Sequence, residues 1–491
     1  MDLDRTACYR ILLARDARHD GRFFTCVKTT GIYCRPICPA RPPKLENCIF
    51  LPTAAAAQEA GFRPCLRCRP ECAPDLAAWR GTSASVSRAL ALIEAGALDQ
   101  GNVDDLAARL GIGERHLRRL FRHHLGATPV TIAQTRRVLL AKQLIHDTDL
   151  PMTEVALASG FGSIRRFNET FHALYARPPG ELRRRRAACP PEYGITLLLP
   201  YRPPYDWPAM LAFLAARAIR GVEQVSENTY RRAIAMDSAT GEIEVRHTPE
   251  RNALSATVRF PRLDALPSII ARIRRLFDLA ADPGEIAAVL GRDTVLTPLV
   301  AARPGLRVPG AWDGFEIAVR AILGQQISVP HATRLAGNLV AACGALLAAT
   351  TGLTHAFPTP EQVTPSALAT LGMPRARISA LAELAAAVRA DANLFQPRAS
   401  LAQAVTDLTR LSGIGEWTAH YIAMRAMGET DAFLAGDAAV QRALARHGTC
   451  PTPHTVLARA DNWRPWRAYA VLHLWMSDAT PVRIRNDAIA A

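Results

Sequence analysis

Four cysteines near the N-terminus have the spacing of a metal site. Cys34 and Cys38 form a C-x3-C pair in GIYCRPIC, and Cys65 and Cys68 form a C-x2-C pair in FRPCLRC, 26 residues further on. Both pairs lie in segments rich in proline, glycine and arginine, where turns can direct backbone N–H groups at sulfur. Four thiolates are the ligand set of a closed, tetrahedral zinc site. The spacing predicts one bound Zn2+ and leaves open whether its role is purely structural.

The distribution of cysteine supports a metal over disulfides. Eight of the 11 cysteines lie in residues 1–72. The N-terminal sequence MDLDRTACYR has no apolar segment of a secretion signal, and no run of about 18 apolar residues is free of charge, so we expect a cytoplasmic protein without a membrane span. Clustered thiols in such a compartment favour metal binding. The N-terminal cysteines without ligand spacing are Cys8, Cys26, Cys48 and Cys72, the last being the strongest competitor.

Residues 5–72 resemble the zinc domain of the Ada adaptive-response family, through DARHDGRFFTCVKTTGIYCRPICPAR and EAGFRPCLRCRPEC. The resemblance implies that zinc is bound by Cys34, Cys38, Cys65 and Cys68. It also implies that Cys34 takes a methyl group from a methylphosphotriester in the DNA backbone. Zinc would keep Cys34 as a thiolate, the form that attacks carbon. Methylation would remove one negative charge, which predicts a higher affinity for DNA phosphate.

Positive charge is concentrated in the first part of the chain. The protein carries a net charge of +15, of which residues 1–190, with 29 basic and 18 acidic residues, contribute +11. A basic region beside a nearly neutral one predicts a polyanionic partner, here double-stranded DNA. The arginines that flank the cysteines are candidate phosphate contacts: Arg35, Arg41, Arg63 and Arg67.

Two helix-turn-helix patterns follow the cysteines. In VDDLAARLGIGERHLRRLFRHHLG, a short helix ends at Gly111 and a basic helix follows. The same pattern is repeated by predicted helices over 153–159 and 163–174, which flank a turn at Gly160 to Gly162. The string GF-x-S-x-x-x-F-x-x-x-F and the intervening helix VTIAQTRRVLLAKQLI resemble the AraC family of regulators. The phenylalanines of that string are expected in the core. Exposed candidates for DNA contact are Arg115, His116, Arg118 and Arg119 in the first unit and Ser163, Arg165, Arg166 and Asn168 in the second.

A helix-hairpin-helix pattern marks the C-terminal half. LSGIG, which contains Gly413 and Gly415, lies between two helical patterns and predicts a tight turn whose N–H groups face a phosphate, often with a bound monovalent cation. An aspartate, Asp437, follows about 20 residues later. With YRPPYDW, AVRAILGQQIS and NWRPWRAYAVLHLW, residues 194–480 resemble the AlkA-type 3-methyladenine DNA glycosylase II family.

The glycosylase resemblance implies an active site. A cationic alkylated purine would be flipped out of the stack and held by aromatic rings, which are Trp417, Tyr421 and Trp475. Asp437 would stabilise the oxocarbenium-like sugar and orient water, although an aspartate before AAVQRAL also fits a helix N-cap. Gln326 takes the place of the residue that enters the gap in the DNA. Since the family's wedge residue is apolar, Gln326 departs from the pattern.

Lysine decides whether strand cleavage is expected. The bifunctional members of this superfamily use a lysine near the hairpin to form a Schiff base, and here Trp417 occupies that position. The chain has lysine only at positions 28, 44 and 142. We therefore expect a monofunctional glycosylase without lyase activity. The Pro-Cys-His-Arg motif of alkylguanine methyltransferases is absent, so repair of O6-methylguanine is not expected.

The expected fold is multidomain α+β, in four parts. These are a small four-cysteine zinc domain (residues 1–80), an all-α double helix-turn-helix domain (81–190), a TATA-binding-protein-like α+β lobe (191–283) and an all-α helix-hairpin-helix glycosylase domain (284–491). The predicted function is repair of DNA alkylation and its transcriptional regulation, with RNA polymerase as a further partner. Two alternatives stay open: a transcription factor with an inert glycosylase half, and a glycosylase with a purely structural zinc domain.

Overall fold

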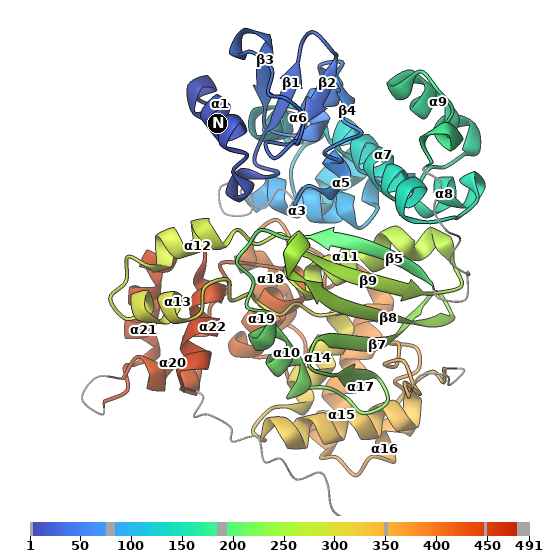
Figure 1. The fold of residues 1–491 in the computed structure, drawn as a ribbon. Coiled ribbons are helices and arrows are strands. Elements are labelled where there is room, and N and C mark those ends of the chain that lie inside the picture. Colours follow the sequence, from blue (N-terminus) through green and yellow to red (C-terminus); the bar gives the residue numbers. More distant parts are fainter. Residues whose placement is uncertain (1–2, 75–83, 184–193, 348–351, 446–448, 479–491) are drawn as a thin grey trace, which may run out of the picture.

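A four-stranded sheet carries the N-terminal cysteines. The computed structural model describes residues 3–74, 84–183, 194–347, 352–445 and 449–478 (Figure 1). The strand order is β3-β1-β2-β4, with β2 and β4 parallel and the other pairs antiparallel. Helix α2 is capped by the Thr53 side chain and packs Ala54 and Ala57 against the sheet, whereas its Ala55 and Ala56 face the helices of the next domain. The elements are α1 (Arg5–Ala14), β1 (Phe24–Val27), β2 (Ile32–Cys34), β3 (Cys48–Leu51), α2 (Ala54–Glu59) and β4 (Arg63–Pro64).

Seven helices form the second part, and they confirm the double helix-turn-helix outline. Asn102 and Ser163 cap the helices α5 and α9 through their side chains. Gly160 has a φ of +84° in the second turn, and a Cβ there would lie 2.8 Å from an oxygen of Asp99, so this position needs glycine. The helices are α3 (Ala84–Glu94), α4 (Ala97–Gln100), α5 (Val103–Arg109), α6 (Glu114–Leu125), α7 (Pro129–Asp147), α8 (Met152–Ala158) and α9 (Ile164–Tyr175).

A five-stranded antiparallel sheet forms the α+β lobe, in the order β5-β9-β8-β7-β6. Buried Leu254, Ala256 and Val258 alternate with half-buried residues along β9, so one face of the strand packs against α10 and α11. The elements are β5 (Ile195–Pro200), α10 (Trp207–Ala215), β6 (Glu223–Val225), β7 (Thr229–Met236), β8 (Ala239–Thr248), β9 (Ala253–Arg259) and α11 (Leu266–Leu276).

Helices joined by loops make up the remaining described residues, with one isolated bridge between Leu346 and His355. They pack around one large apolar core, to which Phe213 of the lobe also belongs. A π-helix, Ala423–Met427, follows α19 directly. The helices are α12 (Pro283–Leu290), α13 (Leu296–Ala302), α14 (Gly314–Leu323), α15 (Val329–Cys343), α16 (Pro365–Ala369), α17 (Arg375–Ala390), α18 (Leu401–Thr409), α19 (Glu416–Ile422), α20 (Ala438–Ala443), α21 (Pro453–Ala460) and α22 (Arg467–Asp478).

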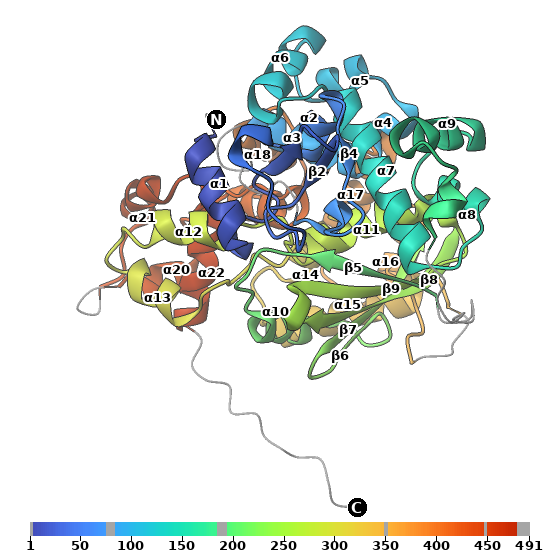
Figure 2. The same cartoon turned by 45° about the horizontal axis from the view of Figure 1, so that its top comes forward.

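The parts share packing surfaces. One apolar core joins Val138 of α7 and Phe167 of α9 to Leu197 and Ile269 of the lobe. Figures 1 and 2 show the zinc sheet and the helix-turn-helix domain resting on the lobe and the helical domain. The two proposed boundaries at residues 80/81 and 190/191, and the arginine run after Arg183, lie outside the described residues. None of the described helices is long and apolar enough to cross a membrane.

Candidate zinc centre and glycosylase active site

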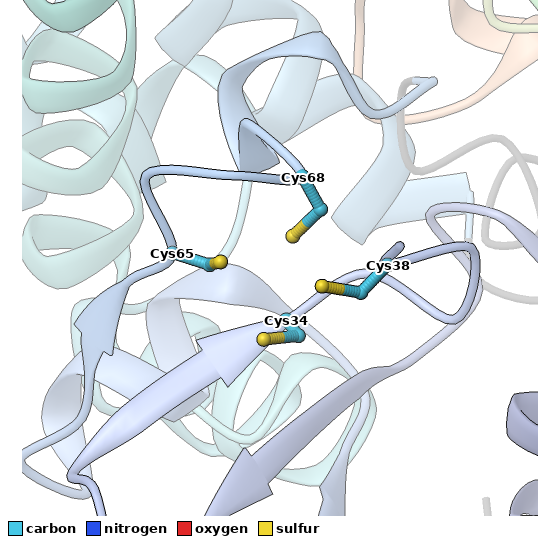
Figure 3. A group of neighbouring side chains, drawn as sticks. All are labelled: Cys34, Cys38, Cys65 and Cys68. Carbon is cyan, nitrogen blue, oxygen red and sulfur yellow. The ribbon is translucent and has the colours of Figure 1, made fainter. Parts of the chain in front are cut away.

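The four cysteines predicted to bind metal converge in space. Cys34 ends β2 and Cys65 follows β4, so the parallel pairing of these strands brings the two thiols together, and the turns after them supply Cys38 and Cys68. Their sulfur atoms all lie within 4.8 Å of one another and point to a common centre (Figure 3). Sulfur atoms around one Zn2+ are about 3.8 Å apart, given a Zn–S bond of about 2.3 Å. The donor set and its spacing fit zinc.

Burial distinguishes Cys34 from the other three cysteines. Cys38, Cys65 and Cys68 are buried, whereas Cys34 is half-buried. Backbone N–H groups stabilise two of the buried sulfurs: Arg35 N lies 3.4 Å from Cys68 Sγ, and Arg67 N lies 3.3 Å from Cys65 Sγ. Cys34 is therefore the ligand that an outside molecule reaches most easily. The competitor Cys72 is outside the cluster, as are Cys8, Cys26 and Cys48.

The predicted phosphate contact at Arg35 needs correction. Its guanidinium is largely buried and ion-paired with Asp20, and it also donates to the carbonyl oxygen of Cys68 at 3.1 Å. Because both acceptors are internal, the Arg35 side chain supports the turn that carries Cys68 and does not project toward a ligand. Arg41 and Arg67, by contrast, are exposed beside the cluster.

A buried lysine that sequence reasoning missed supports the cluster from the helix-turn-helix domain. Lys142 of α7 is fully buried, and its Nζ donates to Glu71 at 2.8 Å and to the carbonyl of Cys65 at 3.0 Å. Arg69 pairs with Glu71 and with Asp147 at the end of the same helix. The available signal was a lysine that lies between Ala141 and the apolar pair Leu144 and Ile145 in this helical pattern.

The predicted DNA-contact residues lie on α6 and α9. Arg115 and Arg119 are exposed on α6, and Arg118 is half-buried and pairs with Glu114 at 2.6 Å. On α9, Arg165 and Arg166 are exposed, and Arg165 pairs with Glu169 at 2.8 Å. These i, i+4 pairs are weak and exposed, so a phosphate can replace them. The predicted core residues of the second unit, Phe161, Phe167 and Phe171, are buried.

The helix-hairpin-helix forms as expected. Helices α18 and α19 are joined by a turn in which Gly413 has a φ of +77°, and a Cβ at this residue would lie 2.8 Å from that of Ala380. Gly415 is the exposed N-cap of α19. The backbone conformation and the lack of space for a Cβ both require glycine at residue 413. At residue 415, glycine has no side chain, so the backbone N–H is open to a ligand.

Asp437 lies at the centre of a hydrogen-bonded group. It caps α20, since its Oδ1 accepts from the N–H groups of Ala439 and Val440 at 3.0 Å. The indole Nε1 of Trp475 donates to Oδ1 at 3.0 Å, and that of Trp417 donates to Oδ2 at 3.1 Å. The two roles considered for Asp437, helix cap and site carboxylate, are therefore compatible.

The aromatic residues form one group around this carboxylate. The rings of Trp417 and Tyr421 stack with centroids 5.3 Å apart and an angle of 10°, and Tyr421 lies 6.5 Å from Trp475. The hydroxyl of Tyr421 accepts a hydrogen bond from Arg425 at 2.5 Å. Burial raises the pKa of Tyr421, whereas the positive charges of Arg425 and Arg217 lower it. The lowering outweighs the effect of burial, so the pKa of Tyr421 lies below its ordinary value. Trp417 is 38% exposed and offers a ring to solvent.

Gln326 occupies an exposed turn between α14 and α15. Its φ of +62° lies in the left-handed region, which is uncommon for a residue other than glycine. The neighbouring Gln325 fixes this turn to the hairpin, because its Nε2 donates to the carbonyl of Gly413 at 2.7 Å. The side chain of Gln326 thus projects from a turn held against the DNA-binding hairpin.

Comparison with known proteins accounts for all four parts. Family models match residues 7–71 (metal binding domain of Ada), 106–185 (helix-turn-helix domain), 196–313 (AlkA N-terminal domain) and 319–468 (HhH-GPD superfamily base excision DNA repair protein). A probable bifunctional transcriptional activator/DNA repair enzyme AlkA of Mycobacterium tuberculosis is 40% identical over 485 residues, which cover 98% of this chain and 97% of the relative. The chain belongs to this family of AlkA-type activator and repair fusions.

Shorter relatives match its halves separately. DNA-3-methyladenine glycosylase 2 of Escherichia coli is 37% identical over 57% of this chain and 96% of its own length. The activator/DNA repair enzyme Ada of Escherichia coli is 35% identical over 31% of this chain, and the match spans 42% of its length. The 3-methyladenine DNA glycosylase structure from Archaeoglobus fulgidus, with 23% identity and a TM-score of 0.51, covers 57% of this chain and 97% of its own, and it shares the fold.

These matches confirm the sequence-based identification. The AlkA-type fusion acts on DNA as a glycosylase and contains an Ada-type zinc domain and a helix-turn-helix domain. The predicted zinc ion is supported by both the domain match and the four converging cysteines. The roles of individual residues stay predictions.

Proposed function

We propose that the protein hydrolyses the N-glycosidic bond of alkylated purines of the 3-methyladenine and 7-methylguanine type, with Asp437 as the catalytic carboxylate. The supporting observation is the pair of indole N–H groups, from Trp417 and Trp475, that holds both oxygens of Asp437. A carboxylate fixed in this way is ready to face the positive charge that develops on the sugar as the base departs. It also lies next to the hairpin, whose turn would contact the DNA backbone.

The aromatic group suits a cationic base. An alkylated purine carries positive charge, which both weakens its bond to the sugar and favours stacking on an electron-rich ring. Trp417 and Tyr421 supply stacked rings beside Asp437. Gln326, on an exposed turn that Gln325 holds against the hairpin, would fill the place that the flipped nucleotide leaves. A monovalent cation at the hairpin turn around Gly413 and Gly415 would complete the backbone contact.

The reaction proposed for the glycosylase ends at the abasic site. The last lysine in the chain is Lys142, and it is buried beside the zinc cluster. No lysine amine is then available at the hairpin to form a Schiff base with the sugar. Borohydride in the presence of damaged DNA should therefore trap no covalent complex.

We further propose that Cys34 accepts a methyl group from a methylphosphotriester. Zinc, when bound, would supply charge that keeps the cysteines as thiolates. The Cys34 sulfur attacks the methyl carbon, an S–C bond forms, and the C–O bond breaks with its electron pair on the phosphate, which leaves as the diester. Cys34 is the candidate because it is the half-buried member of the cluster.

This transfer would link damage to transcription. Loss of one negative charge at Cys34 lowers the repulsion between the zinc domain and DNA phosphate, so the methylated protein binds promoters more tightly. The helix-turn-helix units would select the site, and RNA polymerase would be the partner recruited there. The contact between α7 and the cluster, through Lys142, gives the two domains a common support.

A mass map of the zinc-loaded protein after incubation with methylated DNA tests both activities, with base release followed in the same tube. One added methyl on the Cys34 peptide, together with free methylpurine, is the expected result. Base release with an unmodified Cys34 would show that the zinc site is only structural. Methylation of Cys34 without base release would leave a regulator with an inert glycosylase half. Cys34→Ser should abolish methyl acceptance and keep base release. Asp437→Asn should abolish base release and keep methyl acceptance.

A further inference from the structure

Arg88 of α3 joins the helix-turn-helix domain to the glycosylase domain. Its Nε lies 2.7 Å from Oε1 of Glu429, its Nη2 lies 2.9 Å from Oε2, and its Nη1 donates to the carbonyl of Ala399 at 2.9 Å. The side chains of Arg88 and Glu429 are each 10% exposed. All three guanidinium nitrogens of Arg88 are thus occupied by the other domain, in the bidentate geometry that gives arginine its directional pairing.

The two segments that Arg88 contacts both lead to the active site. Ala399 precedes Ser400, the N-cap of α18, which is the first helix of the hairpin. Glu429 follows the π-helix and stands near the start of the segment 428–437, which ends at Asp437. One side chain from the neighbouring domain therefore holds the DNA-binding hairpin helix and the segment of the catalytic carboxylate together.

Contacts inside the helical domain fix the rest of this segment. Asp431 accepts from Arg467 Nε at 2.7 Å, and Arg467 begins α22, the helix that carries Trp475. Asp437 itself is held by the two indoles. The position of Asp437 relative to the aromatic rings is thus set within the helical domain, whereas its position relative to α18 depends also on Arg88.

A second contact lies at the same joint, the place where Arg88 meets Ala399 and Glu429. Gly111, in the turn of the first helix-turn-helix unit, has a φ of +67°, and a Cβ built there would lie 3.1 Å from that of Ala399. Helix α18 has nine residues and is about 14 Å long, so this joint stands at the end opposite the hairpin turn. Gly413 and Gly415, in the hairpin turn, stay exposed while the two domains are in contact.

We propose that Arg88 is a positioning residue of the glycosylase, supplied by the helix-turn-helix domain. It sets the register of the hairpin helix against the Asp437 segment, so the rate of base release depends on the docked regulator domain. The relative from Escherichia coli is matched over 96% of its length by 57% of this chain, so such a glycosylase exists without a helix-turn-helix domain. In this chain, Glu429 is a buried carboxylate whose partner comes from that added domain. The inference rests on the glycosylase activity proposed above.

A double-mutant cycle on the full-length, zinc-loaded protein tests this role. Base release from methylated DNA without a promoter sequence is measured at saturating DNA and at limiting DNA, for the wild type, Arg88→Met, Glu429→Gln and the double variant. We expect each single variant to lower kcat about three- to tenfold with KM nearly unchanged. We expect the double variant to lose no more than either single variant, because both remove one interaction.

The matched control is Arg136→Met. Arg136 forms an ion pair with Asp99 inside the helix-turn-helix domain, so this variant weakens the same domain without touching the joint. Its kcat should equal that of the wild type. Equal losses in Arg136→Met and Arg88→Met would overturn the inference, as would wild-type kcat in both joint variants. If the wild type itself released no base, the proposed function and this inference would fail together, whereas release by the wild type and by Arg88→Met alike would overturn this inference alone.

Discussion

The indole of Trp475 donates a hydrogen bond to Asp437, with Nε1 3.0 Å from Oδ1. The two residues are 38 positions apart in the chain, on α22 and at the start of α20. Trp417 donates to the other carboxylate oxygen from the hairpin side. A single carboxylate is thereby fixed by the hairpin, by its own helix and by the last described helix.

Replacement of Asp437 by asparagine should separate catalysis from folding. Asparagine caps helices about as well as aspartate, so α20 should form, but the negative charge opposite the sugar is lost. We expect base release to fall by on the order of 10² to 10⁴, with the affinity for lesion DNA nearly unchanged. Single-turnover release and a DNA-binding titration measure the two effects. Asp264→Asn, which removes an exposed ion pair with Arg262 far from Asp437 in the sequence, is the control and should behave as the wild type.

Replacement of Gln326 by glycine should lower activity without lowering stability. Glycine adopts the left-handed backbone conformation of this turn without steric cost, so the free energy of unfolding should stay the same or rise by about 1 kcal/mol. A side chain that fills the gap in the DNA would be lost, so base release should fall. Thermal unfolding and base release on one preparation test this. Undiminished release would show that Gln326 has no part in holding the flipped state.

Replacement of Lys142 by methionine should destabilise the zinc domain. The change removes the fully buried cation from Glu71, which then keeps only the half-buried Arg69, and it takes a donor from the carbonyl of Cys65. Breaking a buried pair by removing one partner costs about 3 to 5 kcal/mol, and the remaining Arg69 should hold the loss to the lower end of that range. We expect faster loss of zinc to a chelator. Lys44→Met, at an exposed lysine of the same domain, should leave the rate unchanged; equal rates in the two variants would show that Lys142 does not support the cluster.

Acid should weaken the helical domain through His473. Burial lowers the pKa of this histidine on α22 to about 4, and a hydrogen bond with the backbone of Leu299 opposes the shift only in part. The unfolded chain takes up a proton below pH about 6.5, while the folded protein does not do so until pH about 4. Stability is therefore full above pH about 6.5 and is lost as the pH falls toward 4, by about 2 kcal/mol at pH 5.

Urea unfolding at pH 7.5 and pH 5, followed by tryptophan fluorescence, measures this pH effect. His473→Gln should reduce the difference between the two pH values, because glutamine does not titrate. His331→Asn, at an exposed histidine, should keep the whole difference. An unchanged pH dependence in His473→Gln would assign the acid sensitivity to other groups.

Sequence patterns were sufficient where the chemistry is carried by neighbouring residues. The two cysteine pairs, the turns of the helix-turn-helix units and the LSGIG hairpin each lie within a few positions, and local geometry places their members together. The same holds for the helix cap at Asp437, since its N–H donors are two and three residues away.

Only the tertiary structure decided which charged residues turn inward. Arg35 resembles its exposed neighbours in sequence, but the fold places Asp20 against it, so it supports the zinc loop. Lys142 and Glu71 are 71 positions apart, and Arg88 and Glu429 are 341 positions apart. Pairs of this kind depend on how whole domains dock, and no short-range periodicity contains that information. The sequence by itself therefore determined the family and predicted which residues form each site, whereas packing between domains decided what holds those residues in place.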